Sequence, residues 1–390
     1  MSKSNHAGHF FQTTEALATT SRKAAKAKNQ HGDPIKMSSK VLALCRDIFS
    51  DPSNPAIFVA EAVGEVKRVF LEDGKTERIF NGSSAPLTCL AICPITRTLF
   101  TGSWDKSIYA IPLSSPSSYK TLTSHTDFLK TLLTASLHGK PILISGSADA
   151  SIIIWDITTS SILHKLPSAH SKAIQHLSVD PLSPTHESFT LFSTSSSPEI
   201  RRWHISLDAC YELPESISSP IRPHETSIYS LTWDSDGEGL WTASADFTAK
   251  HLVRHRDWSP DTTLQHKDFV RDVLPIEERG LIVTACRDEG VRVWDASSGK
   301  LVVDYEGHFE EVMALVAGRK GREVVSAGID GTVRRWGLSR EGMREFAEER
   351  EKERSGLVKE EKEEEKGKEG MLTAEEEAEL AELMGSDDDE

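Results

Sequence analysis

The chain has 390 residues, of which 38% are hydrophobic and 27% charged, and its formal net charge is −15. This composition is typical of a globular chain with a large core, and the lack of any long apolar run excludes a membrane-spanning helix. The first residues lack the apolar stretch of a secretory signal, and the five cysteines include no CxxC pair. We therefore expect a reduced compartment, the cytoplasm or the nucleus, and no metal or other cofactor.

The N-terminal 39 residues are polar and weakly basic. Together with Lys40 they contain seven Lys and Arg against two acidic residues, and the lysines of SRKAAKAK (21–28) are diluted by alanine. A segment without sustained hydrophobic periodicity is expected to stay solvated, so residues 1–39 are predicted to be a flexible basic arm. A nuclear-import or nucleic-acid patch and an organelle-targeting presequence are the alternatives for this segment.

From residue 40 a pattern recurs with a period of about forty residues. In its fullest form a histidine is followed four positions later by an aliphatic residue, and then by Ser or Thr, Asp and Trp at fixed spacings. Runs such as LIVTA and GVRVW within the units have the β-branched content of strands. Seven units fit, and their positions equivalent to the Trp are Val69, Ile111, Trp155, Trp203, Leu252, Trp294 and Trp336.

Trp155-Asp156 and Trp294-Asp295 end their strands with a Trp-Asp dipeptide, and Gly307-His308 opens the last unit. In these features residues 40–346 resemble the WD-repeat family, whose members include the Gβ subunit. The resemblance implies an all-β fold, a seven-bladed β-propeller with four antiparallel strands in each blade.

Three units keep all four marks of the pattern. In the family, these residues form a hydrogen-bonded tetrad within a blade, in which imidazole, hydroxyl and indole groups satisfy a carboxylate that is costly to bury alone. Because the set recurs from blade to blade, we interpret it as structural and not as a Ser-His-Asp catalytic site. The expected tetrads are His125, Ser145, Asp149 and Trp155; His266, Thr284, Asp288 and Trp294; and His308, Ser326, Asp330 and Trp336.

Other units depart from the pattern. Blade one lacks the His, Asp and Trp, blade four has Ser197-Pro198 in place of the Asp turn, and blades two and five have Ile111 and Leu252 at the Trp position. The strand that closes the ring is expected from residues 343–347 or, alternatively, from residues 10–14. The segment NQHGDPIK (29–36) is a poor strand candidate because of its Gly and Pro.

The C-terminal segment is strongly acidic, since residues 341–390 hold 21 acidic residues against 8 Lys and Arg. We predict an acidic low-complexity tail over residues 347–390 that is solvated or forms a lone helix. Thr373 and Glu376 have the spacing of a capping box, and Leu380, Leu383 and Met384 fall on one face, so a short helix is expected near 373–384. The tail is suited to a basic protein partner.

The family resemblance also implies a binding surface on the narrower rim face of the propeller. By analogy with other members, three positions per blade face outward there: three and five residues after the His, and one before the Asp. Aromatic residues and Arg dominate binding hot spots, so a partner segment there should be apolar and acidic. The alternative is that some aromatics fold inward over the central channel. The candidate rim-face residues are Trp104, Phe128, Lys130, Tyr229, Phe269, Arg271 and Arg287.

The motifs GxSxG, GxGxxG, the phosphate loop and HExxH do not occur in the sequence. The favoured function is a non-catalytic scaffold that binds other proteins as a monomeric propeller within a larger hetero-complex, away from membranes. A ubiquitin-ligase adaptor is an alternative, although WDIT, WHIS, WDAS and WGLS lack the Arg of the family's Trp-Asp-x-Arg. An RNA- or chromatin-associated subunit would need the arm for direct nucleic-acid contact, because the body is not basic. No residue pattern supports a propeller hydrolase.

Overall fold

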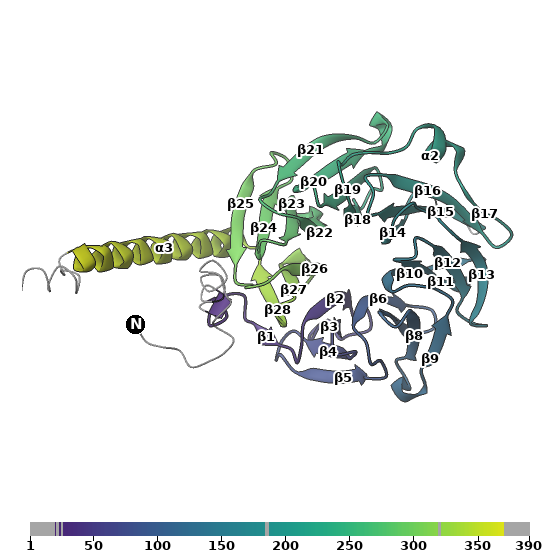
Figure 1. The fold of residues 1–390 in the computed structure, drawn as a ribbon, viewed down its shortest axis with the longest axis horizontal. Helices are drawn as coiled ribbons and strands as arrows, with labels where there is room; N and C mark the ends of the chain where they lie inside the picture. Colours follow the sequence, from purple (N-terminus) through teal and green to yellow (C-terminus); the bar gives the residue numbers. More distant parts are fainter. Residues whose placement is uncertain (1–19, 21–22, 25, 184–186, 319–320, 370–390) are drawn as a thin grey trace, which may run out of the picture. The chain divides into compact units, whose positions relative to one another are not determined.

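The computed structural model describes residues 20, 23–24, 26–183, 187–318 and 321–369. The chain divides into two compact units, Met1–Leu338 and Ser339–Glu390. The described residues of the first unit form seven four-stranded antiparallel sheets, which are arranged as blades around a central axis (Figure 1). The seven-bladed β-propeller that the repeats predict is therefore confirmed.

In blades one to six the four strands are consecutive in the chain. Blades one to three consist of β2 (Val41–Arg46), β3 (Ala56–Glu61), β4 (Val66–Phe70) and β5 (Thr76–Phe80); β6 (Leu87–Cys93), β7 (Thr98–Ser103), β8 (Ser107–Pro112) and β9 (Lys120–Thr123); and β10 (Leu129–Leu137), β11 (Lys140–Ser147), β12 (Ile152–Asp156) and β13 (Ser161–Leu166). Blades four to six consist of β14 (Ile174–Val179), β15 (Ser188–Ser195), β16 (Ile200–Ser206) and β17 (Cys210–Glu212); β18 (Ile228–Trp233), β19 (Gly239–Ser244), β20 (Thr248–Val253) and β21 (Ser259–Gln265); and β22 (Val270–Ile276), β23 (Leu281–Cys286), β24 (Gly290–Asp295) and β25 (Leu301–Glu306). Short helices occur in some connections, namely η2 (Pro116–Ser118), α2 (Pro214–Ser218), η3 (Arg254–Arg256) and η4 (Glu277–Arg279).

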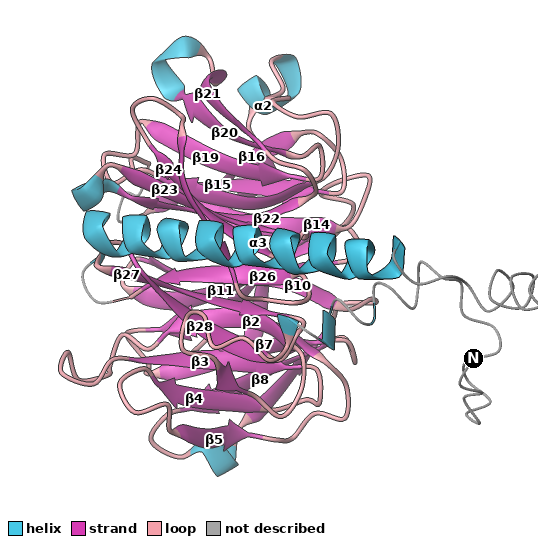
Figure 2. Ribbon diagram, turned by 90° about the vertical axis from the view of Figure 1, so that its left-hand side faces the viewer, coloured by secondary structure: helices cyan, strands magenta, loops and turns pink. Residues whose placement is uncertain are grey.

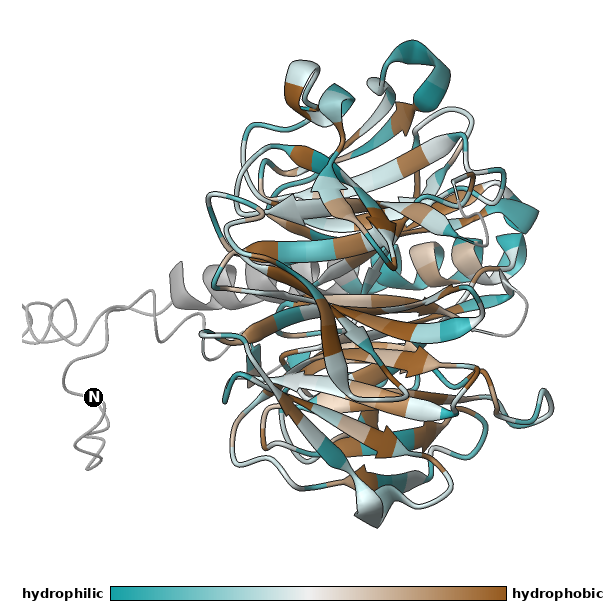
Figure 3. Cartoon of the chain, turned by 90° about the vertical axis from the view of Figure 1, so that its right-hand side faces the viewer, coloured by the Kyte–Doolittle hydropathy of each residue, from teal (hydrophilic) through white to brown (hydrophobic). Residues whose placement is uncertain are grey.

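The hydrophobic core is divided into layers between neighbouring blades. Ile144 and Ile154 of blade three, for example, belong to one buried cluster with Leu177 and Leu191 of blade four. Second strands such as β3 and β23 are buried at every residue, as expected for strands covered on both faces. Figure 3 shows the hydrophobic residues gathered on the strands and the connecting loops mostly hydrophilic. Packing sheet on sheet in a circle leaves few sheet edges exposed.

The ring is closed by a strand from residues 29–36, the segment that the sequence indicated to be a poor strand candidate. Blade seven contains β26 (Val312–Ala317), β27 (Glu323–Gly328), β28 (Thr332–Gly337) and β1 (Ile35–Lys36), which pairs antiparallel with β28. The expectation of a closing strand at Met343–Ala347 was wrong, because those residues lie in a helix. Residues 35–36 also belong to the sheet, although residues 1–39 were predicted to be a flexible arm. The alternative closing strand at residues 10–14 lies outside the described residues.

Glycine and proline disfavour a strand locally, but in this segment they position a two-residue strand at the sheet edge. Pro34 precedes the paired residues, so its missing N–H costs no ladder hydrogen bond. Gly32 has a φ of 71°, and a Cβ on it would lie 2.8 Å from the ring of Trp336. The Gly32 carbonyl accepts a hydrogen bond from the backbone N–H of Arg335 at 2.7 Å. Gly32 therefore allows the chain to cross the Trp336 indole closely before it enters the sheet.

The second unit contains α3 (Arg340–Glu369), drawn in Figure 2 as one continuous helix. The propeller strands end with β28, so the predicted propeller boundary at residue 346 was too late. Glu, Lys and Arg favour helices, and pairs such as Arg344 and Glu348, 3.7 Å apart, add i,i+4 support. The helix predicted near residues 373–384 lies outside the described residues. Among the residues that the structure describes, no helix is long and apolar enough to cross a membrane.

Candidate functional site

Two blades contain the complete hydrogen-bonded tetrad. In blade three, Ser145 Oγ lies 2.8 Å from His125 Nε2 and accepts a hydrogen bond from Trp155 Nε1 at 2.9 Å. The other imidazole nitrogen, His125 Nδ1, lies 3.2 Å from Asp149. Blade seven has the same arrangement, with distances of 2.7, 2.8 and 2.8 Å for the corresponding contacts among His308, Ser326, Trp336 and Asp330.

The electrostatics of the tetrad favour a neutral imidazole beside a carboxylate. Burial lowers the pKa of His125. Burial alone would raise the pKa of Asp149, but hydrogen bonds from Ser151 and the Thr126 backbone, together with the histidine, hold it below its usual range. The Ser145 hydroxyl is fully buried, so no substrate can reach it. The geometry supports a structural role for this group and not nucleophilic catalysis.

Blade six breaks the tetrad that its sequence predicts. Thr284 Oγ1 contacts His266 Nε2 and Trp294 Nε1 at 2.8 and 2.9 Å, but His266 Nδ1 is bonded to the Leu264 carbonyl. Asp288 is not part of this hydrogen-bonded network; it accepts hydrogen bonds from Arg292 at 2.7 and 3.0 Å instead.

The cause of this difference is the residue two positions after the aspartate. There, Ser151 and Thr332 donate a hydroxyl to the aspartate and contact the histidine Nδ1 in blades three and seven. In blade six this position is Gly290, which has no side chain to link the two groups. Arg292 approaches instead, and a Cβ on Gly290 would lie 3.0 Å from its Nη2.

The incomplete units keep parts of the same network. In blade five His224 contacts Thr242 at 2.7 Å and Asp246 at 2.8 Å, with Leu252 in place of the Trp. In blade four His170 and Trp203 both contact Ser193, and burial and the charge of Arg201 lower the pKa of His170 to about 3. These blades are held by fewer polar links, as their sequences indicate.

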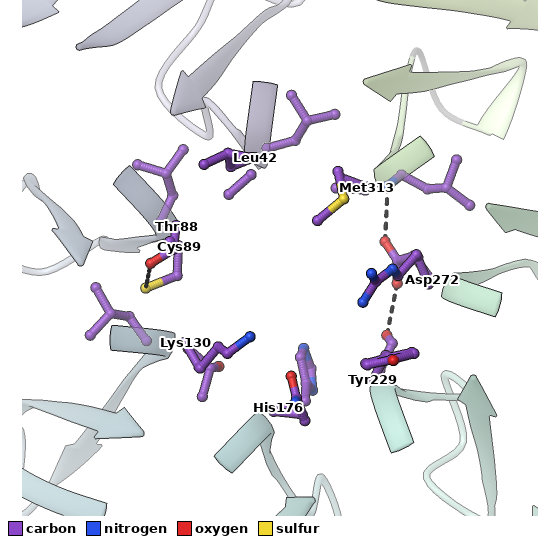
Figure 4. A pocket seen from close by; sticks show the side chains of 18 of the residues that line it. Leu42, Thr88, Cys89, Lys130, His176, Tyr229, Asp272 and Met313 are labelled. Carbon is purple, nitrogen blue, oxygen red and sulfur yellow. Dashed lines mark hydrogen bonds between the residues drawn. The ribbon is translucent and has the colours of Figure 1, made fainter. Parts of the chain in front are cut away.

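A second repeated feature builds the mouth of the central channel. The first strand of every blade has a register shift at its second residue, as at Leu129/Thr131 and Val270/Asp272. A β-bulge re-aims the side chain of the extra residue. The seven bulged residues line a cavity of 490 Å³ in the channel and are Leu42, Thr88, Lys130, Gln175, Tyr229, Arg271 and Met313. In Figure 4, Leu42, Lys130 and Met313 extend toward the opening from different sides.

We call these seven residues the bulge ring, and its composition is uneven. Blades seven and one contribute Met313 and Leu42, which are apolar. Blades three and six contribute Lys130 and Arg271, and the positions between them are the polar Gln175 and Tyr229. The cationic and apolar parts therefore lie on different arcs of the same opening.

Aromatic side chains extend the bulge ring outward over the rim. Trp104, 53% exposed in the turn between β7 and β8, lies 5.8 Å from Phe128 between ring centroids. On blades five and six, Phe269 stacks on Phe247 at 5.7 Å and lies 6.3 Å from Tyr229. The rim therefore has two aromatic clusters, one on blades two and three and the other on blades five and six.

Three cations lie over these aromatic rings. Lys130 Nζ is 5.3 Å from the centroid of Phe128, and Arg287 is 4.9 Å from that of Phe269. Arg271 is 4.3 Å from the Tyr229 centroid and also forms an ion pair with Glu311. Such cation–π contacts hold the charged groups at the protein surface without neutralising them.

The structure thus brings all seven predicted rim-face residues to one end of the propeller, but in two settings. Trp104 and Arg287 are exposed in turns, whereas the other five are partly buried at or beside the channel mouth, namely Phe128, Lys130, Tyr229, Phe269 and Arg271. Sequence reasoning missed Phe247, which is 40% exposed and has a φ of 68°. The signal was an aromatic residue directly after the turn aspartate, where a left-handed backbone favours small or polar residues.

Part of the N-terminal segment also lies on this rim. Lys26 forms an ion pair with Glu289 and Lys23 one with Glu310, both at 2.7 Å. Asn29 donates a hydrogen bond to the Gly307 carbonyl and accepts one from Arg334. The described residues before β1 therefore contact blades six and seven, in contrast to the predicted solvated arm.

Comparison with known proteins agrees with this architecture. The model of the WD domain, G-beta repeat, matches residues 74–110, 116–156 and 299–337. An uncharacterised WD repeat-containing protein of Schizosaccharomyces pombe is 34% identical over 346 residues, which is 86% of this chain and 90% of that protein. The nuclear distribution protein nudF of Aspergillus niger is 24% identical over 67% of this chain and 61% of its own length. Among solved structures, the WD40 β-propeller domain of Doa1 has the same fold, with a TM-score of 0.65, 18% identity, and coverage of 80% of this chain and 97% of that one.

Proposed function

This chain belongs to the WD-repeat family, and from that premise we propose that it is a non-catalytic scaffold of a larger intracellular complex. Its rim face binds a protein segment that combines apolar and acidic side chains. A fold of this kind supports many functions, so the proposal depends on the site and not on the propeller itself. The observation that carries it is the pairing of the rings of Phe128, Tyr229 and Phe269 with cations on one rim, beside the exposed Trp104.

The physical argument concerns what these groups gain from a partner. Trp104 keeps half of its large apolar surface in water, and burying it contributes to binding. Arg287 is exposed beside Phe269 and can pair with a carboxylate while it stays on the ring. Aromatic residues with adjacent Arg are the residue types in which binding energy is concentrated. The acidic C-terminal tail, at residues 347–390, supplies a second contact for a basic partner in this proposal.

The test compares two double variants of the full chain in affinity purification with mass spectrometry. Trp104→Ala with Arg287→Ala removes the exposed ring of one aromatic cluster and the exposed cation that lies over the other. Ile95→Ala with Lys75→Ala is the matched control, because both residues are exposed and lie in loops that emerge from the opposite end of the blades. We expect the rim variant to lose partners that the control retains, with unchanged thermal unfolding in both. Normal capture by the rim variant contradicts the proposal.

A further inference from the structure

We propose that the bulge ring is a docking site for an acidic side chain of the protein partner, which enters the channel mouth between Lys130 and Arg271. This inference rests on the proposed function and assigns the acidic part of the partner to one position. It is carried by the charges, the unused hydrogen-bonding groups and the uneven composition of the ring.

Lys130 is the first part of the argument. Its ammonium lies over Phe128, and among the described residues no carboxylate lies within ion-pairing distance of it. Burial at the channel mouth and the positive charge of Arg271 both lower the pKa of Lys130. Glu311 pairs with Arg271 and Asp272 lies in the channel wall, so the repulsion between the two cations is only partly offset. A carboxylate placed there relieves this repulsion.

The groups between the two cations suit the same ligand. Tyr229 carries Arg271 on its ring, and its hydroxyl has no hydrogen-bond partner among the described residues, so it is available to donate to a carboxylate. Arg271 already pairs with Glu311 on the blade seven side, which fixes its guanidinium at the mouth. A guanidinium has five N–H donors, and one ion pair does not use them all. Lys130, Tyr229 and Arg271 therefore form an arc of donors facing the opening.

The opposite arc identifies the occupant as a protein segment and not a free small anion. Met313 and Leu42 give this side of the mouth an apolar surface, and Trp104 is exposed outside it. A phosphate or a free carboxylate leaves all of this surface in water. An extended segment with an Asp or Glu flanked by apolar residues fills the cationic arc and covers the apolar arc and Trp104 together.

The experiment uses a displayed library of random peptides, selected on the folded full chain and on two variants. Lys130→Met removes the charge but keeps the aliphatic stem over Phe128. Lys75→Met is the matched control, with the same loss of one charge at the other end of the blades. Wild type and the control should select peptides with an Asp or Glu beside aromatic or aliphatic residues. Those peptides should bind Lys130→Met more weakly by about thirtyfold or more, as is typical when one partner of a desolvated charge pair is removed.

Two further arms separate the ways in which this inference can fail. If the selected peptides bind Trp104→Ala more weakly but bind Lys130→Met as well as the wild type, and if they show no preference for acidic residues, the rim-face function stands and the acid site is wrong. If inorganic phosphate alone stabilises the wild type against heat in a Lys130-dependent way while no acidic peptide is selected, the mouth is a small-anion site and the inference is overturned. If no peptide depends on either residue, both proposals fail. Thermal unfolding of each variant confirms that it is folded.

Discussion

A carboxylate in the channel wall gives the clearest prediction about stability. Asp272 accepts hydrogen bonds from Ser230 Oγ at 2.7 Å, from the Leu315 backbone at 2.9 Å and from the Val273 backbone at 3.0 Å, so it links blades five, six and seven. Burial nevertheless raises the pKa of Asp272 to about 6, because these three hydrogen bonds only partly offset the desolvation of the charge. Ionisation of Asp272 is therefore less favourable in the folded protein than in the unfolded chain.

The direction of the pH effect follows from proton linkage. The folded pKa of Asp272 lies above the ordinary value of 3.8, so the contribution of this group is full below that value and is lost as the pH rises through about 6. A shift of about two units corresponds to about 3 kcal/mol. An amide in place of the carboxylate regains this free energy because it carries no charge. The gain is smaller by about 1 kcal/mol because channel water partly solvates the carboxylate, and by about another 1 kcal/mol because the hydrogen bond from Val273 is lost.

We therefore expect Asp272→Asn to raise the free energy of unfolding by about 1 kcal/mol near neutral pH and to have no such advantage near pH 4. The amide nitrogen can donate to Ser230 Oγ while the oxygen accepts from Leu315. Urea unfolding across this pH range measures the difference. Asp246→Asn is the contrasting variant, because hydrogen bonds with His224 and Thr248 outweigh burial and hold the pKa of Asp246 below its usual range. It should lose stability at neutral pH. A destabilised Asp272→Asn with the pH profile of the wild type refutes the argument.

Two further predictions concern the channel mouth and the ring closure. Burial and a neighbouring arginine lower the pKa of Lys130, whereas an ion pair with a neighbouring aspartate raises the pKa of Lys75. Lys130 should therefore be acylated faster than Lys75 at mildly alkaline pH. Peptide mass spectrometry compares the two lysines, and equal rates contradict the assignment. Gly32→Ala should lower the unfolding temperature more than Gly280→Ala: both glycines have positive φ, which costs an alanine about 1 kcal/mol, but only at Gly32 does the added Cβ meet the ring of Trp336. Equal shifts in the two variants show that the close crossing does not limit stability.

The fold could be predicted from the sequence because the same pattern of residues recurs in successive blades. The strand content, the spacing and the tetrads of His125 and His308 all indicate the same four-stranded type of blade. The prediction failed at Asp288 because it used four positions and ignored a fifth, where Gly290 replaces the hydroxyl residue that joins aspartate to histidine. A pattern of spacings carries no information about which neighbour supplies the next hydrogen bond.

The closing strand could not be predicted from strand propensity. Ile35 and Lys36 form a sheet edge of two residues, and their pairing depends on β28, which lies about three hundred residues later in the chain. Gly32 and Pro34 disfavour a strand locally, but they are the residues that bring the chain past Trp336 to that edge. Tertiary contacts overrode the local preference in this segment.

The framework of the propeller depends on residues that recur from blade to blade, whereas the candidate site lies at positions where the side chains differ between blades. The same bulge occurs in all seven first strands, so the backbone offers seven equivalent positions around the channel. A ring of seven identical side chains could bind a ligand in any of seven orientations. Lys130 and Arg271 on one arc and Leu42 and Met313 on the other remove that degeneracy, so a bound segment has one favoured direction across the mouth. The symmetry of the backbone provides the positions, and the differences among the side chains make recognition specific.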